Sequence, residues 1–152
     1  MSARQLVSDA VESGRLDDLE RLAIADPRAL RHVLALVYRP EPAIRTAAAR
    51  AIAAASRHRQ ELVGEMARRL VWAMNDESGT HALNAPEVLQ ALAETNPDLL
   101  LPLLPDLLRL TADPALHDRL VEVARLVAAR DRGRAAATVA TALCACARGG
   151  KS

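Results

Sequence analysis

Four helix-breaking clusters recur along the chain at intervals of about 35 residues, and each separates two stretches rich in Leu, Val or Ala. The clusters are Asp26-Pro27-Arg28, His58-Arg59-Gln60, Asn96-Pro97-Asp98 and Asp131-Arg132-Gly133. A fixed period of this size is typical of solenoids, in which each unit buries its apolar face only by stacking on its neighbours. The pattern therefore predicts stacked helical hairpins with long exposed surfaces and no pocket built into the fold.

The composition favours helices throughout. Ala and Leu supply more than a third of the 152 residues, Phe is absent, and Trp72 and Tyr38 are the only aromatic residues. Strands are enriched in β-branched and aromatic residues, whereas Ala is the strongest helix former and lets helix backbones approach closely. We therefore predict an all-α fold.

The helix boundaries follow from proline, glycine and capping residues. Pro102 and Pro105 lie inside one apolar stretch, where each removes a backbone donor, so a kink or a restart is expected there. The chain is predicted to form one repeat domain over residues 1–148 and a flexible tail over 149–152. The helices are expected at about 3–13, 16–25, 27–38, 42–56, 60–74, 86–95, 99–110, 114–130 and 133–147.

Two segments carry a resemblance to a known family. The run Pro42-Ala43-Ile44-Arg45-Thr46-Ala47-Ala48-Ala49-Arg50-Ala51-Ile52 resembles the first helix of a HEAT repeat, with its initial Pro, an Arg one turn later and small residues after it. The run Asn96-Pro97-Asp98-Leu99-Leu100-Leu101-Pro102-Leu103-Leu104-Pro105 is similar to the junction and second helix of such a repeat.

The resemblance covers residues 16–147 and implies a right-handed α-α superhelix of about four HEAT-like hairpins, of the armadillo type. Most HEAT-like proteins are scaffolds for other proteins, so it also implies a non-catalytic scaffold or adaptor. The run from Asn75 to Gly79, followed by Ala85-Pro86-Glu87, is similar to a motif of small prokaryotic HEAT-like proteins. That likeness marks a location and implies no chemistry.

A candidate interaction region begins in the predicted helix over residues 60–74. On a helical wheel Trp72 lies on the side of Glu65 and Arg68, roughly opposite the apolar stripe that contains Leu62. A large aromatic ring on the polar side of a helix is often an interface hot spot. Alternatively, Trp72 packs beneath the next connection, whose polar residues only cap a helix. The residues that we assign to partner binding are Trp72, Asn75, Asp76, Glu77, Ser78, His81 and Glu87, with Arg45 or Arg68 contributing the opposite charge.

The connection over residues 75–87 permits two other interpretations. Asp76, Glu77, His81 and Glu87 are metal-ligand types, but their spacing is irregular and no second His follows at a zinc-type distance. We therefore expect no metal and no cofactor. A small enzyme or cofactor-handling subunit acting at this loop remains a third interpretation of the chain. No Ser/His/Asp or Cys/His set stands at a known catalytic spacing, so we predict no catalytic residues.

Charge is distributed unevenly although the net charge is only +1. Residues 39–69 hold seven Arg against three acidic residues, and residues 70–108 hold six acidic residues and no Lys or Arg. The basic unit at 39–69 is the alternative site, for nucleic acid or a phosphate ligand. The acidic unit that follows, and the lack of a row of stacking aromatics, disfavour nucleic acid.

The remaining features concern location and partners. No apolar run approaches the length of about 18 residues that a bilayer-spanning helix needs. With no apparent signal peptide, we expect Cys144 and Cys146 to be reduced thiols in a cytoplasmic protein. The expected partner is another protein. Because repeat stacks expose apolar end faces, a homo-oligomer is also possible.

Overall fold

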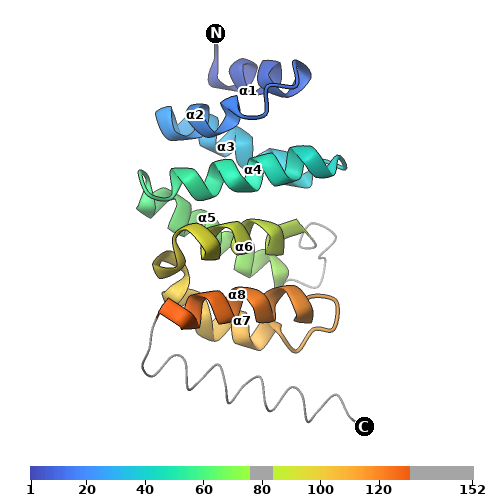
Figure 1. Cartoon of the computed structure of the whole chain (residues 1–152), viewed down its shortest axis with the longest axis vertical. Helices are drawn as coiled ribbons and strands as arrows, with labels where there is room; N and C mark the ends of the chain where they lie inside the picture. Colours follow the sequence, from blue (N-terminus) through green and yellow to red (C-terminus); the bar gives the residue numbers. More distant parts are fainter. Residues whose placement is uncertain (76–83, 131–152) are drawn as a thin grey trace.

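The computed structural model describes residues 1–75 and 84–130. These residues form helices and turns, with no strand among them (Figure 1), so the all-α prediction is confirmed. The predicted helix at 133–147, the tail at 149–152 and residues 76–83 of the long connection lie outside the described residues.

The described helices follow the order of the helices predicted from the sequence. Two of them, η1 and η3, are 3₁₀ helices. The elements are α1 (Ala3–Glu12), α2 (Asp18–Ala25), α3 (Pro27–Ala35), η1 (Leu36–Tyr38), α4 (Pro42–Ala55), α5 (Gln60–Met74), α6 (Ala85–Thr95), η3 (Pro97–Leu103), α7 (Leu104–Leu110) and α8 (His117–Arg130).

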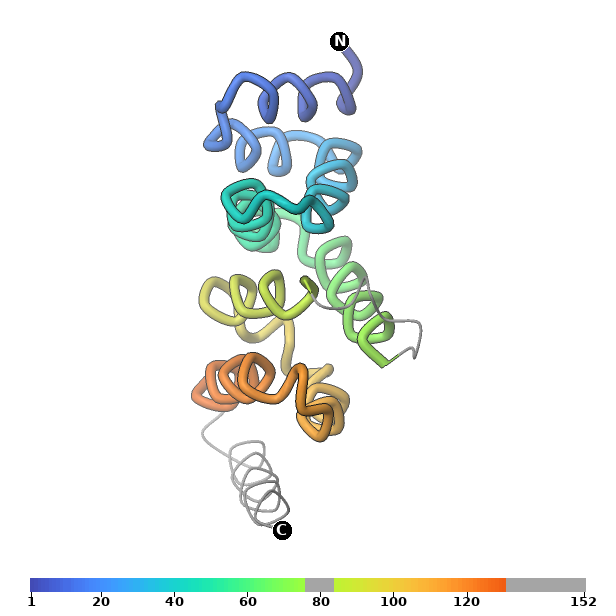
Figure 2. Tube along the Cα trace, turned by 90° about the vertical axis from the view of Figure 1, so that its right-hand side faces the viewer, coloured from blue at the N-terminus to red at the C-terminus, as the bar shows by residue number. Residues whose placement is uncertain are grey.

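The helices form two rows. Helices α2, α4, α6 and α8 pack on one another in that order and form the first row, and α1 lies beyond α2 and α3 at the N-terminal end (Figure 1). The second row holds α3, α5 and the η3–α7 segment, which lie on the other side (Figure 2). Each first-row helix therefore contacts the first-row helices that precede and follow it.

The core lies where the two rows meet, and the first row contributes buried apolar side chains along its whole length. Each of its four helices contributes a side chain with no exposed surface: Leu19, Ile52, Leu89 and Leu120. Helix α4 packs against both α2 and α6 and buries mainly alanine side chains there. Small side chains let the backbones of neighbouring helices come close, which explains why the Ala-rich helix lies inside the row.

Local signals explain where several helices begin. The Asp26 carboxylate accepts a hydrogen bond from the Arg28 N–H at 2.8 Å, and Pro27 occupies the first turn of α3. The expected interruption at the two internal prolines is confirmed. Pro102 lies in η3, and α7 restarts at Leu104 with Pro105 in its first turn.

Two predicted boundaries are wrong by two or three residues. Helix α2 begins at Asp18 rather than Leu16, after a turn in which the Asp18 N–H donates to the Arg15 carbonyl. Helix α8 begins at His117 rather than at residue 114. There the Asp113 carboxylate accepts from the Ala115 N–H at 3.0 Å, which holds the preceding residues in turns.

Close packing of α4 predicts a strong asymmetry between two alanines of the same helix. Ala48 has no exposed surface, whereas Ala43 is exposed. Ala48→Leu should overpack the first row and lower the free energy of unfolding by about 1–3 kcal/mol. Ala43→Leu is the matched control and should change it by less than about 0.5 kcal/mol. Urea denaturation followed by circular dichroism measures both, and equal effects would contradict the packing of α4 described above.

Candidate interaction surface

Trp72 lies on the outer side of α5. Its side chain is 80% exposed, the most exposed of the large apolar side chains after Met1 among the described residues. The inward face of the same helix is formed by Val63, Met66, Ala67, Leu70, Val71 and Met74. This exposure is what the interaction-surface hypothesis requires of Trp72.

A groove, here called the α5 groove, runs between α5 and the η3–α7 segment. It consists of two adjoining hollows of about 390 Å³ and about 400 Å³ that share Arg68, Pro102 and Leu103. The first hollow is lined further by Gln60, Glu61, Gly64, Asn96, Asp98 and Leu99. The second is lined further by Val71, Trp72, Asn75, Asp106, Arg109 and Leu110.

The shape of the α5 groove follows from its two walls. Helix α5 contacts η3 and α7 on one side, and its C-terminal end leans away from the stack (Figure 2). Gly64 carries no side chain, so Leu99 comes close to α5; a β-carbon at Gly64 would stand 3.5 Å from Leu99 Cδ1. The restart of the helix after Pro102 forms the opposite wall. The groove thus combines an apolar floor with charged edges.

Most charged side chains along the α5 groove are paired within the chain. Asp106 pairs with Arg109, and Asp98 lies 3.5 Å from the Arg130 guanidinium. Arg68 and Glu61 make no hydrogen bond or ion pair with any described residue. Within residues 1–75 and 84–130, these are the two charges of the groove that have no partner.

The structure divides the predicted site residues between two surfaces. Trp72, Asn75 and Arg68 line the α5 groove together. Glu87 is on α6 and meets Arg45 of α4, with 3.8 Å between Arg45 Nε and Glu87 Oε2. These two line a different hollow of about 450 Å³ between α4 and α6, into which Arg50 also faces. The predicted residues Asp76, Glu77, Ser78 and His81 lie outside the described residues.

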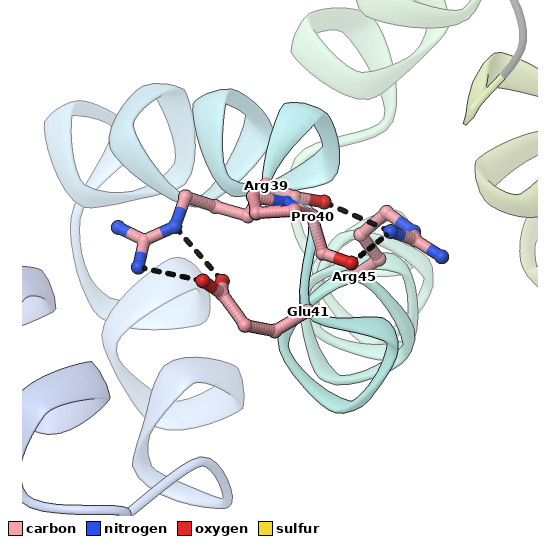
Figure 3. Close-up of polar contacts among 4 residues, drawn as sticks. All are labelled: Arg39, Pro40, Glu41 and Arg45. Carbon is pink, nitrogen blue, oxygen red and sulfur yellow. Dashed lines mark hydrogen bonds and ion pairs between the residues drawn. The ribbon is translucent and has the colours of Figure 1, made fainter.

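Arg45 bonds to the backbone of the turn that precedes α4. Its Nη1 donates to the carbonyl oxygens of Arg39 at 3.0 Å and Pro40 at 2.7 Å (Figure 3). Its Nε is buried without a hydrogen bond, and the carboxylate of Glu87 accepts instead from the Thr46 hydroxyl at 2.8 Å. Arg45 therefore fixes the turn before α4 through Nη1 and links α4 to α6 through its ion pair with Glu87.

The same turn holds an exposed ion pair. The Arg39 guanidinium donates to both carboxylate oxygens of Glu41, at 3.0 Å and 3.4 Å (Figure 3). This hydrogen bonding from Arg39 lowers the pKa of Glu41 from its ordinary value of 4.5.

Most arginines of the basic unit at residues 39–69 bond to carbonyls or carboxylates of the chain itself. Arg57 donates to the Thr95 carbonyl at 3.1 Å, at the end of α6. Arg59 donates to the carbonyls of Ile24 at 3.3 Å and Ala25 at 3.2 Å, at the end of α2. Arg69 pairs with Glu65 at 2.9 Å. Of the seven arginines, only Arg50 and Arg68 have no partner among the described residues.

The sequence analysis missed the wall of the groove that faces α5. Pro102, Leu103, Arg109 and Leu110 line it, and none was a predicted site residue. A signal was present, because two prolines inside one apolar stretch change the course of the helix and open space beside it. That signal predicted the restart but not which helix would face it.

Three further observations bear on function. Within residues 1–75 and 84–130, no three His, Cys, Asp or Glu side chains gather as they would around a metal ion. No helix in the same part of the chain has the length and apolar character needed to cross a bilayer. Comparisons of the chain with protein families, with curated proteins and with solved structures gave no match.

The pKa of Glu41 provides a test of the turn before α4. Arg39→Ala should raise the pKa of Glu41 toward 4.5, because the guanidinium that stabilises the carboxylate is removed. Since the pKa of the folded state is the lower one, the contribution of this pair to stability is lost as the pH falls through it. Carboxyl ¹³C chemical shifts measured against pH report the midpoint. An unchanged midpoint in Arg39→Ala would show that the pair does not form in solution.

The link between hairpins through Arg59 provides a second test. Arg59→Ala should lower the free energy of unfolding by about 1–2 kcal/mol, because carbonyls at the end of α2 lose a charged donor. Arg50→Ala removes an exposed arginine without a partner among the described residues and should change it by less than about 0.5 kcal/mol. Urea denaturation compares the two variants, and equal losses would contradict a specific role for Arg59.

Proposed function

We propose that this protein is a non-catalytic protein-interaction scaffold or adaptor, and that a partner polypeptide binds in the α5 groove. The exposed ring of Trp72 beside an apolar, charge-edged groove carries this proposal. A tryptophan contributes a large contact area at a low cost in conformational entropy, and it is among the residues most enriched in interface hot spots. Arg68 lies one turn before Trp72, has no partner among residues 1–75 and 84–130, and supplies a charged contact at the same place.

The HEAT-type architecture belongs to the same proposal. The serial packing of α2, α4, α6 and α8, with α3, α5 and η3–α7 as second helices, supports a right-handed superhelix of about four hairpins. In such a stack each hairpin contacts only its neighbours, so grooves between second helices remain open along one surface. The α5 groove is a surface of this kind.

The two alternative functions have less support. A nucleic-acid or phosphate binder would need the arginines of residues 39–69 free on one surface, but five of the seven are engaged with carbonyls or carboxylates of the chain. A small enzyme at the 75–87 loop would need residues that lie mostly outside the described part of the chain. We therefore favour the scaffold.

Site-specific photocrosslinking tests whether a polypeptide occupies the groove. A benzophenone amino acid placed at Trp72 should give a discrete covalent adduct with another polypeptide in the native cell. The matched control is the same amino acid at Tyr38, which is 43% exposed and lies on η1, outside the groove. It should give no such adduct.

Once the adduct is identified, Trp72→Ala should weaken that complex by about ten-fold or more, as truncation of an aromatic hot spot does. Absence of an adduct at position 72, or the same adduct from position 38, would overturn the proposed function.

A further inference from the structure

The groove-facing side of α5 carries two opposite charges that have no partner among the described residues. Glu61 and Arg68 both line the first hollow, seven residues apart. Seven residues are about two turns of an α-helix, so the two side chains lie on one face about 10 Å apart. Gly64 lies between them and also lines this hollow. Trp72 continues the same stripe one turn beyond Arg68.

The order of these two charges makes this face of α5 complementary to the same face of a second copy. In an antiparallel pair of identical helices, a two-fold axis between Gly64 and Glu65 would place Glu61 of each copy opposite Arg68 of the other. The contact is isologous, because the same patch serves both copies and each ion pair occurs twice. Trp72 of each copy would then lie opposite Arg57 of the other copy, in the turn that precedes α5.

We propose that the occupant of the α5 groove is a second copy of this chain, docked through an antiparallel pairing of the two α5 helices. This inference rests on the proposed interaction role of the groove and names its partner. Each α5 lies over the groove of the other copy, and Trp72 is covered at both ends of the interface. Glu61 and Arg68, which have no partner in the described part of the chain, set the register.

Other features of the chain are compatible with self-association at this place. The net charge of +1 creates little repulsion between two copies at a distance. The remaining acids on the groove, Asp98 and Asp106, are paired within the chain and do not compete for Arg68.

A second copy also fits better than an unrelated helix. An unrelated partner would need an acid and a base two turns apart in the correct order, together with a surface for Trp72. The chain itself provides all of these by symmetry. The contact is a small one built on a single pair of helices, so the dimer should depend on both concentration and salt.

The wild-type chain provides the first measurement. Trp72 is the only tryptophan, so its fluorescence reports directly on this surface. Sedimentation equilibrium should show a monomer–dimer equilibrium, and the tryptophan emission should shift to the blue over the same concentration range. A monomer at every soluble concentration would overturn the inference, as would a dimer that forms without any change in Trp72 emission.

Charge reversal tests the register. Glu61→Arg and Arg68→Glu should each weaken the homodimer by about ten-fold or more, because each turns two attractive pairs into repulsive ones. The double variant Glu61→Arg/Arg68→Glu exchanges the two charges and should restore the wild-type dissociation constant to within about three-fold. Arg50→Glu, which reverses an open arginine on α4, is the matched control and should leave it unchanged.

Mixing the two single variants separates loss of the interface from loss of the fold. An equimolar mixture of Glu61→Arg and Arg68→Glu should form a heterodimer, since each arginine of one variant faces a glutamate of the other. Dimerisation that survives both single variants, or a mixture that stays monomeric, would overturn the antiparallel α5 pairing. If the wild-type chain is monomeric while position 72 still crosslinks to a different protein, the second copy is excluded and the proposed scaffold function stands.

Discussion

The burial of α4 between α2 and α6 is the contact on which the rest of the stack depends. An alanine-rich helix has little apolar surface of its own, so it gains stability only when neighbours pack closely on both sides. The first row provides this by placing α2 and α6 on opposite sides of α4. Helix α6 also packs on α8, so the row continues to the end of the described chain. The helices of the second row pack against the first row, and this packing sets their position.

The second row is held more loosely, and its recognition surface arises from that difference. Arg57 and Arg59, at the turn between α4 and α5, bond to carbonyls at the ends of α6 and α2. They fix the start of α5 against two neighbouring hairpins. The far end of α5 leans away from the stack (Figure 2), which opens the groove beside η3 and α7 and leaves Trp72 exposed.

Local signals in the sequence predicted the helices well and the boundaries less well. Asp26-Pro27 and the pair Pro102 and Pro105 act through backbone geometry and missing donors, so their effect can be deduced without knowing the fold. The start of α8 was placed three residues too early, because the Asp113 side chain bonds to the Ala115 N–H in a turn that periodicity does not reveal. The outward position of Trp72 followed from the helical wheel alone.

The sequence by itself determined that the chain is helical, where most helices break, and which face of α5 is polar. These depend on interactions between residues close in the chain. Only the tertiary structure decided that Glu87 belongs with Arg45, while Trp72 and Arg68 face Leu103 and Arg109. The angle at which α5 leaves the row decides which residues share a groove, and that angle results from packing between helices that are distant in sequence. No local pattern encodes it.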